Sequence, residues 1–248
     1  MIPVLSFGPI SLPVPELLLI FGIYIGIVLS EKLADKTGVP PKEVSDLLFL
    51  MIVSGLIGAR LSYLASDPLA FQGNFLSIFS LNTNFFEPST GIVISLAVGY
   101  YLVSKKSLGL LSSLDALIPF LGILITFIRL SSFASGTNFG MQTSLPWGIQ
   151  LWSQTRHPVN LYLALGSLIA LGIGIWALNR SDLQPGCAFA LFGLSTAVSS
   201  LVLTRYQAPT DLIGNSIRLN QILWLAAAIL FYLIYLRLSP GVRDGSSK

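Results

Sequence analysis

Hydrophobic residues make up 53% of this 248-residue chain and charged residues only 10%, and its mean hydropathy is +0.78, values that exclude an ordinary soluble domain and indicate an integral membrane protein. The net charge is +3 with scattered basic residues, so we expect no nucleic acid partner. One cysteine excludes an internal disulfide, and one histidine without an HExxH motif excludes a familiar zinc site, so we expect no metal and no cofactor.

Seven apolar segments follow one another along the chain, and each approaches the roughly 20 residues that a helix needs to cross the hydrocarbon layer. We expect transmembrane helices over 15–30, 46–65, 90–104, 115–132, 158–178, 186–204 and 218–237. The third segment is short and can be tilted or extended into STGIV. Residues 1–14 lack the features of a removable signal peptide, so the first helix is expected to direct insertion. The predicted fold is a single all-α transmembrane domain over 1–248.

Basic residues between the segments predict the orientation, because connections on the cytoplasmic side of a membrane are enriched in Lys and Arg. One set of helix ends carries most of them: Lys32, Lys36, Lys42, Lys105, Lys106, Arg180, Arg237, Arg243 and Lys248. The opposite set carries Arg156, Arg205 and Arg218. We therefore expect the N-terminus outside the membrane and the C-terminus in the cytoplasm.

With that orientation, arginines and no lysine gather near the outer leaflet. They are Arg60 in the second helix, Arg129 near the outer end of the fourth, Arg156 beside the fifth and Arg205 after the sixth. A charged side chain in a membrane is costly, so it usually faces the bundle interior, a cavity or a partner. A guanidinium group binds two phosphate oxygens at once. We therefore expect these arginines to bind an anionic phospholipid headgroup.

Structural interpretations stay open for several of these residues. Arg60 and Arg129 can snorkel to the interface or pair with an acid at the same end. The candidate acids are Glu16, Asp67, Glu87 and Asp211. His157 can accept a proton, but its position in RHP at the start of the fifth helix favours a hydrogen-bonded turn. Tyr63 and Tyr162 can hold a headgroup, although packing at the interface is favoured.

The connection at 133–157, between the fourth and fifth helices, is the best candidate for an outward-facing lid or cleft wall. It contains small residues for close backbone approach and hydrogen-bonding side chains such as Thr137 and Asn138. Trp147 and Trp152 suit a membrane interface. Non-helical backbone at membrane depth is tolerated where it lines a cavity. We therefore expect this connection to form part of the site.

Other residues are expected to pack between helices and to do no chemistry. Cys187 stands in LQPGC, which loosely resembles a lipid-attachment motif, but a packed free thiol is favoured. Small residues on one helix face let a neighbouring helix approach closely. We expect such contacts at Gly55, Gly58, Ala59, Gly166, Gly172 and Gly174.

Six segments of the chain carry distinctive motifs. The opening segment is FGPISLPVPELLLIFGIYIG, and the second helix reads VSDLLFLMIVSGLIGARLSYL. The fourth helix and its connection read IRLSSFASGTNFGMQTSLPWGI, and RHPVNLY, RYQAPTD and LNQILWLAAAIL follow. In this order the segments resemble those of the bacterial prolipoprotein diacylglyceryl transferases. The first two are similar to the family's opening segment and its GGRLGY-type helix, the third is in the frame of the signature GRIGNFxNGExxGxxTxxPW, and the last three are similar to RHPxQLY, RxPD and GQILS.

The resemblance implies a seven-helix, multi-pass enzyme of the bacterial inner membrane. Such an enzyme transfers the diacylglyceryl group of phosphatidylglycerol to the lipobox cysteine of a preprolipoprotein, leaving a thioether and releasing glycerol phosphate, as the first step of lipoprotein maturation. Arg129 corresponds to the signature arginine at the lipid phosphate and Arg205 to the essential arginine after the sixth helix, so both are expected to be catalytic. The expected substrate-binding residues are Arg60, Tyr63, Thr137, Asn138, Gly140, Arg156 and His157.

The chain departs from the family at several polar positions. Ser132, Ser135 and Thr137 stand where the signature has Asn, Asn and Glu. Ser89 stands where the family often has a histidine, and Val14 and Pro15 fall in the place of an aromatic pair. Two functions are therefore weighed. One is an active, divergent transferase, which we favour because fold, orientation and arginines agree; the other is a family member that has lost the chemistry and binds or moves anionic phospholipid.

Overall fold

The computed structural model describes residues 4–7, 10–68, 85–151, 153–208, 212–213 and 217–239. These residues contain seven helices: α1 (Val14–Leu33), α2 (Pro41–Ser66), α3 (Pro88–Lys105), α4 (Leu110–Ser135), α5 (Val159–Leu178), α6 (Cys187–Leu203) and α7 (Leu219–Leu238). Six of them, all except α3, are long and apolar enough to cross a membrane. Every expected segment is thus confirmed as a helix. The third one does extend back through STGIV, since α3 begins at Pro88.

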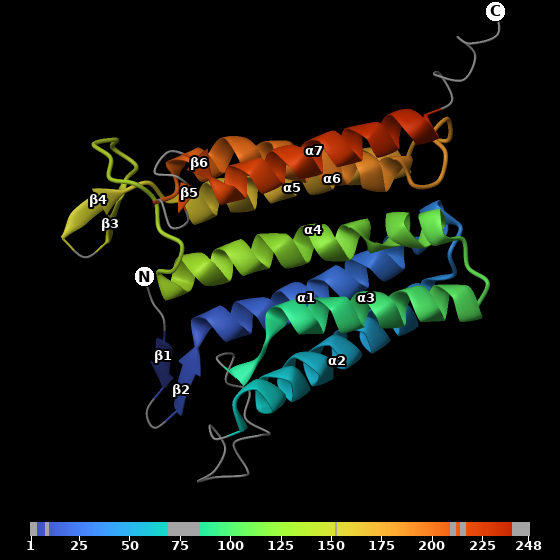
Figure 1. Ribbon diagram of the computed structural model, residues 1–248, viewed down its shortest axis with the longest axis horizontal. Coiled ribbons are helices and arrows are strands. Elements are labelled where there is room, and N and C mark those ends of the chain that lie inside the picture. The colour runs from blue at the N-terminus through green and yellow to red at the C-terminus, as the bar shows by residue number, and fades with distance from the viewer. Residues whose placement is uncertain are drawn as a thin grey trace, which may run out of the picture.

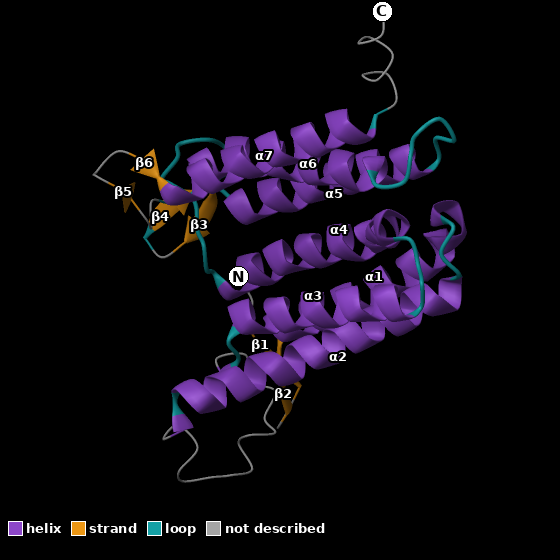
Figure 2. Ribbon diagram, turned by 45° about the vertical axis from the view of Figure 1, so that its right-hand side comes forward, coloured by secondary structure: helices purple, strands orange, loops and turns teal. Residues whose placement is uncertain are grey.

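The described residues also contain three antiparallel hairpins, which the apolar pattern did not predict. They pair β1 (Val4–Phe7) with β2 (Ile10–Pro13), β3 (Ile149–Leu151) with β4 (Gln154–Arg156), and β5 (Leu212–Ile213) with β6 (Ile217–Arg218). The short 3-10 helices η1 (Ala34–Thr37) and η5 (Thr204–Tyr206) follow α1 and α6. All three hairpins lie at the same end of the bundle (Figures 1 and 2).

The helices lie side by side in the order α3, α2, α1, α4, α5, α6 and α7. Figure 1 shows α4 in the middle, with α1–α3 below it and α5–α7 above it. Consecutive helices run in opposite directions, so each end of the bundle collects alternate connections. We call the end at the left of Figure 1 the arginine end, because Arg60, Arg129, Arg156, Arg205 and Arg218 lie there. The opposite end, which carries the lysines, is the lysine end.

α4 forms the centre of the bundle because two of its faces pack closely against neighbours. Toward α1, an added Cβ at Gly22 would lie 2.5 Å from the Cβ of Phe127, so only glycine allows this approach. Toward α5, the hydroxyl oxygens of Thr126 and Ser167 are 2.7 Å apart and share a hydrogen bond. These contacts fix the position of α4 along the bundle and therefore the depth at which Arg129 lies.

The close contacts expected at small residues are confirmed at most positions. An added Cβ would come between 2.4 and 3.1 Å from a neighbouring helix at Gly55, Gly58, Gly166 and Gly174. Ala59 is buried against α3, as expected. The expectation is wrong for Gly172, which has no atom within 4 Å of an added Cβ and faces open space. Cys187 is fully buried, which confirms a packed free thiol.

Candidate active site

The connection between α4 and α5 lies at the arginine end. α4 continues to Ser135, so the first residues of the expected 133–157 connection are helical. Gly136 then ends the helix in a left-handed conformation with φ of 76°, and Asn138 follows with φ of 52°. The chain turns there, and residues 139–143 run between two other segments.

Residues 139–143 form the middle of a three-segment arrangement, which we call the junction. On one side they pair with residues 154–157, where the amide of His157 donates a hydrogen bond of 2.9 Å to the carbonyl of Met141. On the other side they pair with residues 204–208, to which the amide of Met141 donates a hydrogen bond of 2.8 Å. The junction therefore ties together the end of α4, the start of α5 and the end of α6.

Gly140 allows the junction to close. An added Cβ at Gly140 would lie 2.2 Å from the carbonyl oxygen of His157 and 2.9 Å from a methyl group of Val159. A packed interior cannot absorb such an overlap without shifting the backbone. Gly140 is thus required by the backbone contact itself, while a contact with substrate stays a prediction.

Arg156 lies within the junction and is held by it. Its Nη1 donates a hydrogen bond of 3.2 Å to the carbonyl of Gly140, and its Nη2 donates one of 2.5 Å to Oε1 of Gln154. Its guanidinium carbon is 4.7 Å from the centre of the Phe139 ring, within the range of a cation–π contact. These contacts fix the position and orientation of the Arg156 guanidinium group at the arginine end.

His157 is half-buried between two tyrosine rings. Its ring centre lies 5.1 Å from that of Tyr206 and 6.2 Å from that of Tyr162. Its carbonyl accepts a hydrogen bond of 2.9 Å from Val159 at the start of α5, which confirms the expected turn. Its Nδ1 is buried and has no hydrogen-bond partner in the part of the chain that the structure describes. Trp147 Nε1 donates to the Tyr162 hydroxyl at 2.8 Å, so Tyr162 does pack at this surface.

Arg129 lies on the face of α4 that packs against α5. It follows Gly122 and Thr126 at spacings of seven and three residues, which place all three on one helix face. The side chain is half-buried, and within the described ranges it makes no hydrogen bond and no ion pair. A buried charge without a partner is costly, so this guanidinium is available to an anion from outside the chain.

Asn160 adds a second unsatisfied polar group at the α4–α5 interface, and the sequence motifs did not single it out. Its side chain is only 3% exposed, and its Nδ2 donates a hydrogen bond of 2.8 Å to the carbonyl of Thr137. Its Oδ1 is buried without a hydrogen-bond partner among the described residues. The available signal was an amide residue at the start of an otherwise apolar helix, in RHPVNLY. The side chains of Thr137 and Asn138 are exposed beside it.

Arg205 lies in η5, directly after α6, with an exposed side chain that makes no hydrogen bond or ion pair to a described residue. A second arginine holds this turn. Arg218 donates hydrogen bonds from Nη1 to the carbonyls of Thr204, Arg205 and Gln207 at 2.9, 2.9 and 3.0 Å. No sequence motif assigned Arg218 a role beyond its charge, although its place directly before α7 indicated a helix-end contact.

Arg60 and Tyr63 lie on the other side of the arginine end, between α2 and α3. Arg60 is buried, and its Nη1 donates a hydrogen bond of 3.0 Å to the carbonyl of Phe85. Its guanidinium carbon lies 5.4 and 5.0 Å from the ring centres of Phe85 and Phe86. The Tyr63 ring centre is 5.7 Å from that of Phe85. The structure therefore places Arg156 and Arg205 in the junction and Arg129 on α4 ahead of it, whereas Arg60 lies among aromatic rings between α2 and α3.

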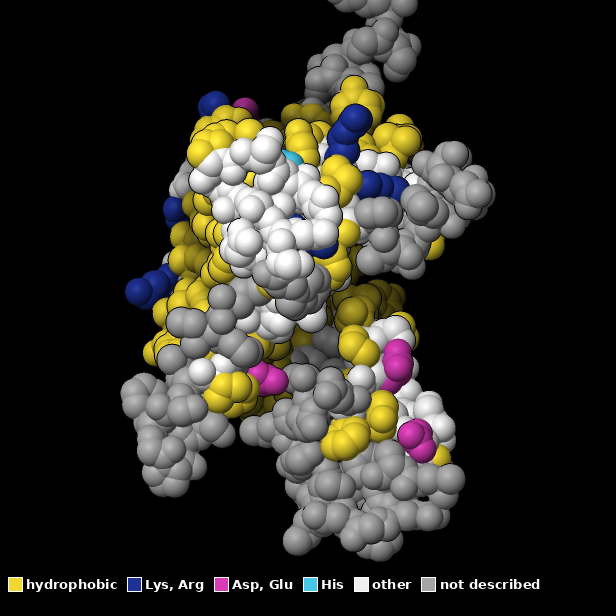
Figure 3. All heavy atoms as spheres, turned by 90° about the vertical axis from the view of Figure 1, so that its left-hand side faces the viewer, with side chains coloured by type: hydrophobic (Ala, Val, Ile, Leu, Met, Phe, Trp, Pro, Cys, Tyr) yellow, Lys and Arg dark blue, Asp and Glu magenta, His cyan; other side chains and the backbone are white. Residues whose placement is uncertain are grey.

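Two of these arginines, Arg129 and Arg205, form no ion pair with an acidic side chain among the described residues. The described ion pairs lie at the lysine end, where Lys106 contacts Glu43 and Asp46. The structural alternative in which Arg129 pairs with Glu16, Asp67 or Glu87 is therefore not realised among the described residues, while Asp211 and Trp152 lie outside them. Figure 3, which looks onto the arginine end, shows basic side chains over its upper part and acidic side chains over its lower part. This separation favours an anionic ligand beside the junction.

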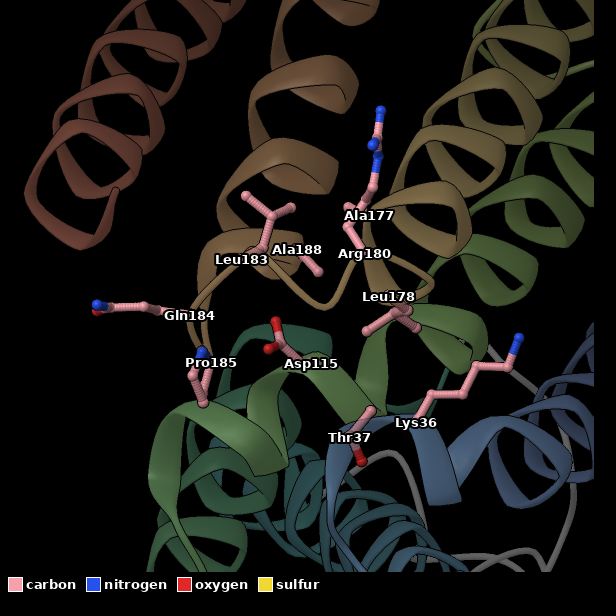
Figure 4. A pocket seen from close by; sticks show the side chains of 10 residues that line it. All are labelled: Lys36, Thr37, Asp115, Ala177, Leu178, Arg180, Leu183, Gln184, Pro185 and Ala188. Carbon is pink, nitrogen blue, oxygen red and sulfur yellow. The ribbon is translucent and has the colours of Figure 1, made fainter. Parts of the chain in front are cut away.

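The lysine end contains a cavity of about 80 Å³ whose lining includes Lys36, Arg180 and Asp115 (Figure 4). The carboxylate of Asp115 is buried and accepts hydrogen bonds of 2.6 and 2.8 Å from the amides of Gly186 and Phe189. These amides lie at the start of α6, where a helix leaves backbone donors unpaired. The geometry explains Asp115 as a helix cap, so we place the site at the arginine end.

Known proteins match the chain over nearly its whole length. The family model described as prolipoprotein diacylglyceryl transferase matches residues 3–237. The phosphatidylglycerol–prolipoprotein diacylglyceryl transferase of Polynucleobacter necessarius is 29% identical over 203 residues, covering 79% of this chain and 76% of the relative. Proteins of the same name from Gloeobacter violaceus and Streptomyces avermitilis are 26% and 28% identical, covering 87% and 98% of this chain and 84% and 74% of the relatives. Because the family match includes all seven helices, this chain belongs to the prolipoprotein diacylglyceryl transferase family.

Proposed function

We propose that this inner-membrane protein transfers the diacylglyceryl group of phosphatidylglycerol to the lipobox cysteine of preprolipoproteins, at the outer leaflet. The observation that carries the proposal is the pair of arginines, Arg129 and Arg205, that lie at one end of a membrane bundle without a described internal partner. A phospholipid phosphate supplies the charge that these guanidinium groups lack. The family relationship supplies the reaction.

Arg129 is suited to hold the phosphate of the lipid. Its position on the α4–α5 face sets it within the bundle, where the low dielectric constant strengthens an ion pair with phosphate. Its planar group can donate two parallel hydrogen bonds to phosphate oxygens. The unpartnered Nδ1 of His157 and Oδ1 of Asn160 are further polar atoms on the same side of the bundle, at the start of α5.

Arg205 is suited to stabilise the leaving group. In the transfer, the cysteine sulfur attacks the glyceryl carbon that bears the phosphate ester. The new carbon–sulfur bond forms as the carbon–oxygen bond breaks, and glycerol phosphate leaves with the electron pair. Charge develops on the departing phosphate oxygen, so donors placed there in advance lower the barrier. The thiol loses its proton to solvent water before the attack, because neighbouring arginines favour the thiolate.

The junction gives these groups a fixed frame. Backbone hydrogen bonds join residues 139–143 to the segments before α5 and after α6, so Arg156 and Arg205 are carried by one connected backbone unit. Catalytic groups must be held close to the productive geometry. A frame of backbone hydrogen bonds supplies that rigidity although the signature positions Ser132, Ser135 and Thr137 carry small hydroxyl side chains.

The proposal is tested with purified protein in phosphatidylglycerol micelles and a fluorescent lipobox peptide. Mass spectrometry should detect a peptide carrying a diacylglyceryl group, with release of glycerol phosphate, and a Cys→Ser peptide should give no product. A family member with the full signature, assayed in parallel, controls for assay conditions. Saturable phosphatidylglycerol binding without any adduct would overturn the transferase and favour a protein that binds or moves anionic lipid.

A further inference from the structure

Arg218 is the last residue before α7, yet its side chain reaches back to the end of α6. The last carbonyls of a helix have no partner within the helix. Arg218 Nη1 donates hydrogen bonds to three carbonyls in this turn, those of Thr204, Arg205 and Gln207, at 2.9 to 3.0 Å. Its Nη2 lies 3.7 Å from Sδ of Met141, in the middle segment of the junction. One side chain thus contacts the turn and the segment beside it.

These three carbonyls lie on both sides of the α-carbon that carries the Arg205 side chain. The carbonyl of Thr204 precedes Arg205, the second belongs to Arg205 itself, and the third follows it by two residues. Fixing the carbonyls on both sides of a residue fixes its backbone dihedral angles, and these set where its side chain can point. The direction of Arg205 therefore depends on the hydrogen bonds from Arg218.

We infer that Arg218 is a positioning residue for diacylglyceryl transfer, acting through Arg205, an inference that rests on the proposed role of Arg205. Arg218 and Arg205 have different roles in this inference. The charge of Arg218 is matched by backbone carbonyl dipoles at a helix C-terminus, where a cation is favourable. The side chain of Arg205 makes no hydrogen bond to a described residue and points outward. Arg218 holds the turn, and Arg205 meets the lipid phosphate.

The first experiment compares Arg218→Gln, Arg218→Lys and the matched control Arg237→Gln in the micelle assay. Arg237 is an exposed arginine at the other end of the same helix, α7. Arg218→Gln should lower kcat about 10- to 100-fold, as misplacing a catalytic group by about 1 Å does. The KM for the lipobox peptide should stay unchanged, Arg218→Lys should restore part of kcat, and Arg237→Gln should match the parent.

The second experiment separates positioning from folding by a double-mutant cycle with Arg205→Lys. If Arg218 acts through Arg205, adding Arg218→Gln to Arg205→Lys should change kcat less than about threefold, because coupled residues are non-additive. A full additional loss in the double variant would overturn the inference. So would a normal kcat in Arg218→Gln. If Arg218→Gln does not accumulate in the membrane, the same cycle with Arg218→Lys decides between additive and non-additive effects.

The same cycle distinguishes failure of the inference from failure of the proposed function. If Arg205→Lys alone leaves transfer unchanged, the proposed role of Arg205 is wrong. If Arg205→Lys lowers transfer while Arg218→Gln does not, only the positioning role is wrong. Retention of each variant in a single peak on gel filtration in detergent shows that the comparison is made between folded proteins.

Discussion

Arg129 and Gly140 place opposite demands on the residues that can replace them. At Arg129 the side chain is half-buried and its charge has no partner among the described residues, so what matters is the shape of the charged group. At Gly140 there is no space, since an added Cβ would meet the carbonyl oxygen of His157 at 2.2 Å. One position is therefore sensitive to chemistry and the other to volume.

Replacing Arg129 by Lys should keep the charge and lose the two-donor geometry. Hydrogen bonds to charged groups each contribute about 1.5–3 kcal/mol, so we expect transfer from phosphatidylglycerol to fall about 10- to 100-fold. The measurement is the initial rate of adduct formation as lipid concentration is varied. Arg180→Lys, at the lysine end, is the matched control and should leave the rate unchanged. An Arg129→Lys rate equal to that of the parent would contradict a bidentate phosphate contact.

Replacing Gly140 by Ala should disturb the junction. Overpacking a filled site costs about 1–3 kcal/mol, so the midpoint of thermal unfolding in detergent should fall, together with the transfer rate. Gly172→Ala makes the same chemical change on α5, at a position with open space. It should leave both quantities unchanged. A Gly140→Ala protein with parental stability and rate would show that the contact with His157 relaxes without consequence.

At the scale of elements, the helices and the junction follow from different kinds of sequence information. Each helix is a long apolar run, so the run itself predicts it, and the observed ends fall within a few residues of those expected. The junction is built by pairing between residues 139–143 and segments at 154–157 and 204–208, which are short and distant along the chain. No local pattern specifies such pairing, and a strand of two or three residues shows no alternation.

The candidate site was accessible from sequence only in part. An arginine at membrane depth has a high energetic cost, and this cost alone indicates a function. Arg129 and Arg205 could therefore be predicted as site residues. Arg60 was selected on the same ground, but its partners at Phe85 and Phe86 come from a connection whose path the sequence does not specify. Asn160 was not predicted as a site residue, because an unpaired buried oxygen is a property of three-dimensional packing.

The start of α6 yields a prediction for a single element. Asp115→Ala removes the acceptor for the amides of Gly186 and Phe189, and leaving buried donors unpaired costs about 1–3 kcal/mol each. The midpoint of thermal unfolding should therefore fall. Transfer per folded molecule should change little, because the cap lies at the lysine end. Asp182 is an exposed acid in the connection between α5 and α6, and Asp182→Ala is the control. A lower transfer rate at unchanged stability would contradict a purely capping role.

At the scale of the whole molecule, the two ends differ in the kind of positive charge they carry. Among the described residues, one end carries the lysines together with Arg180 and Arg237, and the other carries arginines and no lysine. Positive charge is retained in the cytoplasm, so we expect the lysine end inside and the arginine end outside. This orientation matches a reaction on proteins that have been exported.

The orientation is tested by labelling with a membrane-impermeant maleimide in intact cells. Ser144→Cys places a thiol in the exposed connection at the arginine end and should be labelled at once. Ser181→Cys places one in the exposed α5–α6 connection at the lysine end and should be labelled only after the membrane is permeabilised. The reverse pattern would place the N-terminus inside and exclude an outer-leaflet site.

The buried position of Cys187 has a consequence for an enzyme that attaches lipid to thiols. A transferase with an accessible cysteine near its own donor lipid would risk modifying itself. Here the single thiol opens α6 at the lysine end and is fully buried, while the arginine end lies beyond the 17 residues of that helix. At 1.5 Å per residue the separation is roughly 25 Å. Burial and distance together keep this thiol away from a donor lipid held at the arginine end, so we expect the protein not to modify itself.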